Sequence, residues 1–350
     1  MPALDRNLLE IVENHPNGQV RPPGATPRPR NHRTWKTCPP TAVRWSTEEH
    51  RKERDVDSAE APQPTEVRLR GSGGLSLAAD HWKPVRGDDS PGSTILLLHG
   101  GGQTRHSWKN TGQVLAQRGS DVIALDSRGH GDSDWDADAD YSLQAQNRDG
   151  LGVLEQIPEL TGRHDPVTIV GASMGGMAGI GISALAPTGS VDKLVLVDVV
   201  PRFEKSGSQR IRDFMAGNVD GFDDLDQAAA AIAEYLPHRR ATGSSEGLKR
   251  NLRRRDDGRW YWHWDPAFLT PPIDESTIRT DLLERQAQSL TIPIQLIRGR
   301  LSDVVSEQAV RDFVELVPTV EVVELAGAGH TAAGDDNDAF TTAVLDFVDR

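Results

Sequence analysis

Eight short runs rich in strand-forming residues constrain the fold of this chain more than any other feature. They follow one another from residue 66 onward, and several, such as 95–98 and 194–197, contain no polar residue. Continuous apolar runs are typical of strands that are buried on both faces of a parallel sheet. The expected strands are 66–70, 75–82, 94–99, 122–125, 167–170, 193–200, 294–297 and 320–325.

Longer amphipathic stretches separate most of these runs. Helices are expected at about 106–118, 142–158, 174–186, 305–316 and 336–348. Strands alternating with helices indicate the α/β class, with a mostly parallel eight-stranded sheet flanked by helices. We therefore expect the core to comprise residues 66–200 and 294–350.

One interval, 201–293, breaks this alternation. It shows no clear strand, and helical stretches are expected near 206–217, 225–236, 245–254 and 276–288. A helical insertion between two strands of a sheet is typical of a cap. The sequence therefore predicts a helical cap at 201–293, after the sixth strand.

The first 65 residues differ in composition from the rest. They hold ten of the 22 prolines and show little apolar periodicity. Such a segment buries too little apolar surface to offset the entropy lost on ordering. We predict a disordered, Pro-rich N-terminal tail at 1–65.

Charge and cysteine content exclude several classes of protein. The formal net charge is −13, which argues against nucleic acid or an anionic membrane as the main partner. The single cysteine, Cys38, allows neither an intrachain disulfide nor a Cys-rich zinc site. No apolar run is long enough for a membrane span or a secretory signal. We expect a cytoplasmic location, and a homodimer stays open.

A Gly-x-Ser-x-Gly pattern stands between an expected strand and an expected helix. Its residues are Gly171, Ala172, Ser173, Met174 and Gly175. A serine at a sharp strand-to-helix turn has an exposed hydroxyl, and glycines flank it because side chains there would clash with neighbouring elements. Ser173 is the predicted nucleophile.

A second glycine-rich turn follows the expected strand 94–99. It reads His99-Gly100-Gly101-Gly102-Gln103 and offers unobstructed backbone N–H groups. An oxyanion hole needs two such donors aimed at the developing negative charge. We expect these donors to be the N–H groups of Gly101 and Met174.

A nucleophilic serine needs a base, and the base needs an orienting carboxylate. His330, which follows the expected strand 320–325, is the predicted base, with His130 as the alternative. Asp303, after the strand 294–297, is the predicted acid. Asp198, at the end of the strand 193–200, is its rival.

Taken together, these motifs resemble those of the α/β-hydrolase superfamily, in its single-cap group. The resemblance covers residues 66–350 and rests on the glycine-rich turn, the elbow at Ser173, the segment 126–133, Asp303 and the pair Gly329-His330. It implies a serine hydrolase with no metal or organic cofactor. The expected substrate is a small to medium-sized carboxylic ester, cleaved through an acyl-enzyme.

The same fold supports other activities. Superfamily members that use an aspartate nucleophile are disfavoured because position 173 is serine. C–C bond hydrolases resemble this chain in the glycine-rich turn, but they usually carry Asn before the serine and Trp after the histidine, where this chain has Ala172 and Thr331. C–C cleavage and cofactor-free perhydrolysis stay open as alternatives, and a non-catalytic binding protein is the third.

The predicted cap carries an aromatic run at 260–264 and a group of cations. Alternation along a strand would turn half of the aromatic run toward a substrate pocket. The expected substrate-binding residues are Gly102, His106, Trp260, Trp262 and Trp264. The cations could attract an anionic substrate, although a solvated surface is the favoured interpretation. They are Arg239, Arg240, Lys249, Arg250, Arg253, Arg254 and Arg255.

Overall fold

The structure is a computed structural model, and it describes residues 61–85, 92–235, 245–269, 280–326, 328–330 and 337–350. The predicted disorder of 1–65 falls almost wholly outside these residues. The first strand begins at Thr65.

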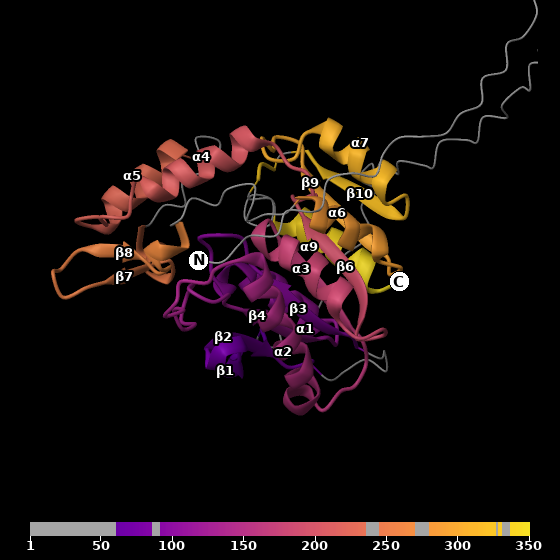
Figure 1. The fold of residues 1–350 in the computed structure, drawn as a ribbon. Coiled ribbons are helices and arrows are strands. Elements are labelled where there is room, and N and C mark those ends of the chain that lie inside the picture. The colour runs from indigo at the N-terminus through magenta and orange to yellow at the C-terminus, as the bar shows by residue number, and fades with distance from the viewer. Residues whose placement is uncertain (1–60, 86–91, 236–244, 270–279, 327, 331–336) are drawn as a thin grey trace, which may run out of the picture. The chain divides into compact units, whose positions relative to one another are not determined.

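The core is one mixed eight-stranded sheet (Figure 1). Its strand order is β1-β2-β4-β3-β5-β6-β9-β10, and β2 runs antiparallel to both of its neighbours. The other pairings from β4 to β10 are parallel, so the predicted mostly parallel sheet is confirmed. The strands are β1 (Thr65–Arg70), β2 (Ser76–Trp82), β3 (Thr94–Leu98), β4 (Asp121–Leu125), β5 (Val167–Ala172), β6 (Val191–Val197), β9 (Ile294–Gly299) and β10 (Val320–Leu325).

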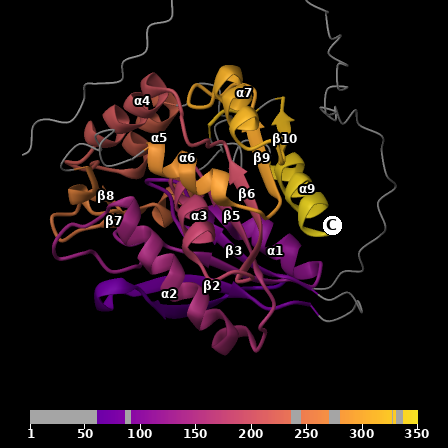
Figure 2. The same ribbon diagram turned by 45° about the vertical axis from the view of Figure 1, so that its right-hand side comes forward.

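Helices cover both faces of the sheet because successive apolar side chains of each buried strand point to opposite faces. In β3, Leu96 and Leu98 pack on the side of α2 (Leu143–Thr161) and α3 (Met174–Leu185), which lie side by side in Figure 2. Ile95 and Leu97 pack on the opposite side, with α1 (Lys109–Gln117) and α9 (Asn337–Val348). None of the helices within the described ranges is long and apolar enough to cross a membrane.

The segment between β6 and β9 is not wholly helical, so that part of the prediction is wrong. It begins with α4 (Lys205–Ala216) and α5 (Leu225–Tyr235). After a 3₁₀ turn at Ser245–Arg250 it forms a hairpin of β7 (Leu252–Arg254) and β8 (Trp260–Trp262). The hairpin turn places Gly258 at φ 84°, a conformation that favours glycine. We call the part from α4 to the 3₁₀ turn Pro266–Leu269 the cap.

The last helix of the predicted cap packs with the core instead. Leu283 and Ala287 of α6 (Thr280–Ser289) are buried in the same apolar cluster as α2 and α3. The helix α7 (Glu307–Leu316) joins this cluster through Ala309 and Phe313. The core layer on this side of the sheet therefore resumes at α6, before β9.

Candidate active site

Ser173 lies at a strained turn between β5 and α3. Its backbone has φ 46° and ψ −112°, an unusual conformation for a residue with a side chain. A Cβ on Gly171 would lie 2.4 Å from the carbonyl oxygen of Gly175, and a Cβ on Gly175 would lie 2.3 Å from that of Leu98. Both flanking positions therefore require glycine, for the steric reason that the sequence suggested.

Two hydrogen bonds join Ser173, His330 and a carboxylate. Ser173 Oγ lies 3.2 Å from Nε2 of His330, which follows β10. Nδ1 of the same ring lies 2.7 Å from Oδ2 of Asp198. The structure thus brings the predicted nucleophile and the predicted base into contact, with Asp198 as the acid.

Asp198 is fully buried and directly follows β6. Its Oδ1 accepts a hydrogen bond from Gly299 N at 3.1 Å, and its Oδ2 accepts one from Ser302 Oγ at 2.5 Å. The carboxylate accepts from these two donors and from the His330 N–H, so all three fix its orientation. Ser302 was not expected to take part, and no sequence pattern marks it.

Asp303 is not the partner of His330, so its prediction as the acid is wrong. Its side chain is 41% exposed and forms an ion pair at 2.8 Å with Arg210 of α4. A Cβ on Gly207 would lie 2.4 Å from Asp303 O, so this stretch of backbone packs against α4. The loop after β9 therefore brings Ser302 to the site and turns Asp303 toward the cap.

The glycine-rich turn after β3 passes beside the serine. A Cβ on Gly100 would lie 3.5 Å from Ser173 Cβ, and one on Gly101 would lie 3.9 Å from Met174 Sδ. Gly100 N and Gly102 N donate to Gln103 Oε1 and His130 Nε2. Among the residues that the structure describes, the N–H groups of Gly101 and Met174 have no acceptor. Both predicted oxyanion donors therefore lie at the serine.

Three buried histidines form hydrogen bonds with the backbone of this turn. His99 donates from Nδ1 to Gly100 O and accepts from Ser127 N. His130 accepts from Gly102 N at Nε2 and donates from Nδ1 to Arg128 O. His263, from the cap, accepts from Gly131 N at 2.7 Å and donates from Nε2 to Gly102 O at 3.2 Å.

All three rings are neutral because burial disfavours their charged form. Burial lowers the pKa of His99, and it lowers the pKa of His130 well below 6.5, with further lowering from the neighbouring His99 and His263. Burial lowers the pKa of His263 to about 3. The Nε2 of His130 accepts a hydrogen bond from Gly102 N, so its lone pair is not directed at Ser173. His130 therefore supports the turn and is not the base for Ser173.

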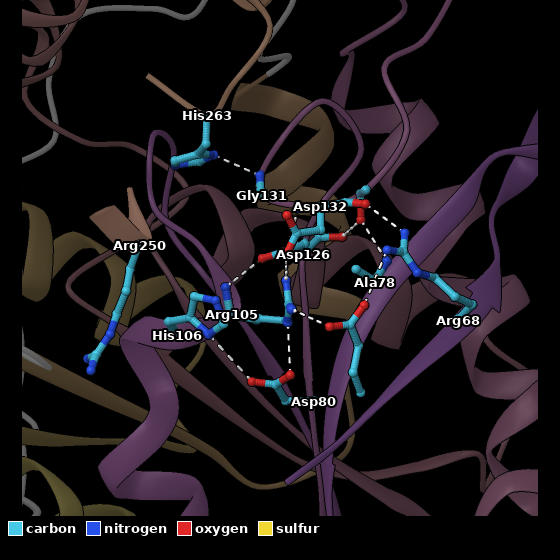
Figure 3. Close-up of polar contacts among 12 residues, drawn as sticks. Arg68, Ala78, Asp80, Arg105, His106, Asp126, Gly131, Asp132, Arg250 and His263 are labelled. Carbon is cyan, nitrogen blue, oxygen red and sulfur yellow. Dashed lines mark hydrogen bonds and ion pairs between the residues drawn. The ribbon is translucent and has the colours of Figure 1, made fainter. Parts of the chain in front are cut away.

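An ion-pair cluster around Arg105 lies near His263 (Figure 3). The Arg105 guanidinium is buried and contacts Asp80, Asp126 and Asp132. Asp132 also pairs at 2.8 Å with Arg253 of the cap. Burial would raise the pKa of Asp132, but its hydrogen bonds from Arg105 and Arg253 lower that pKa to about 2. Arg253 and His263 thus attach the cap hairpin to the loop after β4.

A cavity of about 700 Å³ opens beside Ser173 and His330. Four of the predicted substrate-binding residues line it: Gly102, His106, Trp262 and Trp264. Trp260 is not among the described lining residues, so that prediction is wrong. Its backbone pairs with Phe222, and its side chain packs in a separate apolar cluster of the cap. The α4 side chains Arg212, Phe214 and Met215 also line the cavity, and no sequence pattern marks them as binding residues.

A model of the alpha/beta hydrolase family matches residues 95–343. This chain belongs to the alpha/beta hydrolase family. The expected superfamily is therefore confirmed, and with it hydrolase activity.

Named relatives of this alpha/beta hydrolase include two bacterial enzymes. Esterase Rv0045c of Mycobacterium tuberculosis is 30% identical over 73% of this chain and 82% of its own length. The 3-hydroxybutyrate-oligomer hydrolase of Cupriavidus necator is 26% identical over 75% of this chain and 90% of its own length. A solved structure of E-2-(acetamidomethylene)succinate hydrolase has a TM-score of 0.71 and 22% identity, and the match covers 82% of this chain and all of that one. At that identity it supports the fold alone.

Proposed function

We propose that this hydrolase cleaves carboxylic esters of small to medium-sized molecules through an acyl-enzyme on Ser173. The contact of Ser173 Oγ with His330, whose other nitrogen contacts buried Asp198, carries this proposal. The similarity to a bacterial esterase over most of the chain supports it. The C. necator relative is named for oligomers of a hydroxy acid, which are also esters.

Each step uses an atom already described. Nε2 of His330 takes the proton from Ser173 Oγ as the oxygen attacks the ester carbonyl. The N–H groups of Gly101 and Met174 donate to the oxyanion that forms. The imidazolium then gives its proton to the departing alcohol oxygen, and the acyl group stays on Ser173. His330 next deprotonates a water molecule, whose attack releases the acid and restores the serine.

Asp198 acts on this reaction through the histidine. By accepting the Nδ1–H it keeps the lone pair of Nε2 directed at the serine, and it stabilises the imidazolium. Because Asp198 is fully buried, its charge is little screened by water.

Intact-mass analysis after incubation with a small fluorophosphonate tests the proposal without knowledge of the substrate. We expect one covalent adduct on the wild type and none on S173A. An ester panel should then show turnover that S173A lacks, while the melting temperature of S173A matches the wild type. Wild type without an adduct, or S173A with undiminished turnover, would refute the proposal.

Two further assays distinguish ester hydrolysis from the other reactions that the triad would support. C–C bond cleavage would show as spectral loss of a vinylogous diketone, and perhydrolysis as peracid formation in the presence of hydrogen peroxide. Label on Ser173 with no ester turnover, together with either of these signals, would replace the ester assignment.

A further inference from the structure

The cavity beside Ser173 is positively charged although the chain as a whole is acidic. The described lining residues include two arginines, Arg212 and Arg250, and one carboxylate, Asp140. Asp140 is already engaged, since Arg148 lies 2.9 Å from its Oδ2 and Ser142 Oγ lies 2.5 Å from its Oδ1. In a chain of net charge −13, this leaves the cavity with an excess of positive charge.

Arg250 has no carboxylate or aromatic partner among the described residues, whereas three of the cations near it in sequence do. Lys249 pairs with Glu246, Arg253 with Asp132, and Arg255 stacks on Tyr261. Within the described ranges Arg250 has no ion pair, and in Figure 3 it lies to one side of the Arg105 cluster with no contact drawn to it. Arg239 and Arg240, from the same group of cations, lie outside the described residues.

Arg212 is half-buried on α4, and it too lacks a carboxylate partner in the part of the chain that the structure describes. Its Nη2 donates to the neutral amide of Gln209 at 2.6 Å. A guanidinium has five N–H donors, so most of its donor capacity is available to a ligand.

A third donor lies in the same wall. Trp262 lines the cavity, and its buried Nε1–H has no acceptor among the described residues. Its ring packs against Phe214, two residues along α4 from Arg212, with ring centroids 6.0 Å apart. The next residue, His263, donates its backbone N–H to Asn251 O, beside Arg250. All three donors line the same cavity.

We propose that the cap wall formed by Arg212, Arg250 and Trp262 binds a carboxylate at the end of the substrate remote from the scissile ester. The substrate class is then an ester that keeps a free carboxylate, such as a half-ester of a dicarboxylic acid. Arginine donors match a carboxylate in charge and geometry, and the apolar lining between the cap and Ser173 accommodates a hydrocarbon spacer. This inference rests on the ester hydrolysis proposed above.

A matched pair of substrates tests the inference. One is the 4-nitrophenyl half-ester of adipic, suberic or sebacic acid, and the other is the same compound with its free carboxylate methylated. The three acids vary the distance between the ester and the carboxylate. The quantity compared is the ratio of kcat/KM for the charged ester over that for the neutral ester.

We expect the wild-type ratio to exceed about ten for at least one length, mostly through KM, because the remote carboxylate is bound equally before and during reaction. The ratio should fall toward one in R212Q and in R250Q. R254Q is the matched control, because Arg254 is an exposed cap arginine that bonds to Gly258 O and is not among the cavity lining residues.

Two results would overturn the inference while leaving ester hydrolysis intact. One is a wild-type ratio near or below one at every length, and the other is a ratio that neither R212Q nor R250Q changes. Absence of turnover on both members of every pair, with no fluorophosphonate adduct on Ser173, would instead refute the proposed function, and this inference with it.

Discussion

Asp198 and Asp303 follow the neighbouring strands β6 and β9. Only one of these carboxylates can accept the Nδ1–H of His330, and in the structure it is Asp198. This partner of His330 is fully buried, and hydrogen bonds from Gly299 N and Ser302 Oγ fix its carboxylate. Asp303 lies half in solvent and pairs with Arg210. A single sequence gives both the same context, a carboxylate just past an apolar strand, and it cannot show which way the following loop turns.

D198N should lower kcat on any ester substrate by about 10³ to 10⁴. Gly299 N would hold the amide oxygen, so the amide NH2 would face His330 Nδ1 and favour the tautomer whose proton lies on Nε2, where it cannot accept the proton of Ser173. Steady-state kinetics on a chromogenic ester would measure this. D303N is the control, and it should stay within about threefold of the wild type because an exposed ion pair contributes little. A larger loss in D303N than in D198N would reverse the assignment.

At the scale of elements, the strands and core helices agree with the sequence prediction within a few residues. The buried strands are short runs rich in apolar residues, and the helices are longer amphipathic stretches between them. The hairpin of β7 and β8 was missed because each strand has three residues, which is too short for a period to be visible. The pair Asp257-Gly258 was the available signal, since this dipeptide favours a tight turn. The hydrogen bond between His263 of the cap and Gly102 of the glycine-rich turn could not be predicted either, because the two residues are far apart in sequence.

The elbow depends on close contact between α3 and β3. G175A should lower the free energy of unfolding by about 1–3 kcal/mol or more, because the new methyl group would lie 2.3 Å from Leu98 O and neither backbone can yield cheaply. Urea denaturation would measure the change. G152A is the matched control, since its methyl group meets only Arg70 O at 3.5 Å and alanine suits a helix. Equal stability of the two variants would contradict the packing argument.

The glycine-rich turn depends on its histidines. H130A should lower kcat by about tenfold or more, because Gly102 N loses its acceptor and the neighbouring Gly101 N–H loses its fixed direction. H130Q should recover part of this loss, because the Gln Oε1 lies near the position of the imidazole Nε2 and accepts the same hydrogen bond. A merely space-filling role for His130 predicts no difference in kcat between the two variants at equal melting temperature.

For the molecule as a whole, neutral buried histidines couple stability to pH. A group whose folded pKa lies below its unfolded value of 6.5 binds protons more readily in the unfolded chain, so the free energy of unfolding falls as pH drops below about 6.5. For His263 this loss continues down to its folded pKa of about 3. The lowered carboxyl pKa values of Asp80 and Asp132 affect stability only below their ordinary value of 3.8.

Urea denaturation between pH 6 and 4.5 therefore isolates the histidines. The wild type should lose about 1.4 kcal/mol per pH unit more than H263Q, which has no ring to protonate. Parallel curves for the two proteins would show that His263 is charged in the folded state or already neutral in the unfolded chain.

The order of residues along the chain makes the cap a separable module for protein engineering. Ser173 and Asp198 both precede the first cap helix, and His330 follows the last cap residue. A foreign cap grafted in place of residues 205–269 would interrupt no bond of the triad, because Asp198 lies before α4. It would, however, remove His263 from Gly102 and Arg253 from Asp132. Ser173 of a chimaera should therefore still react with the fluorophosphonate, but the chimaera should lose ester turnover unless the graft retains the hairpin that carries these two residues.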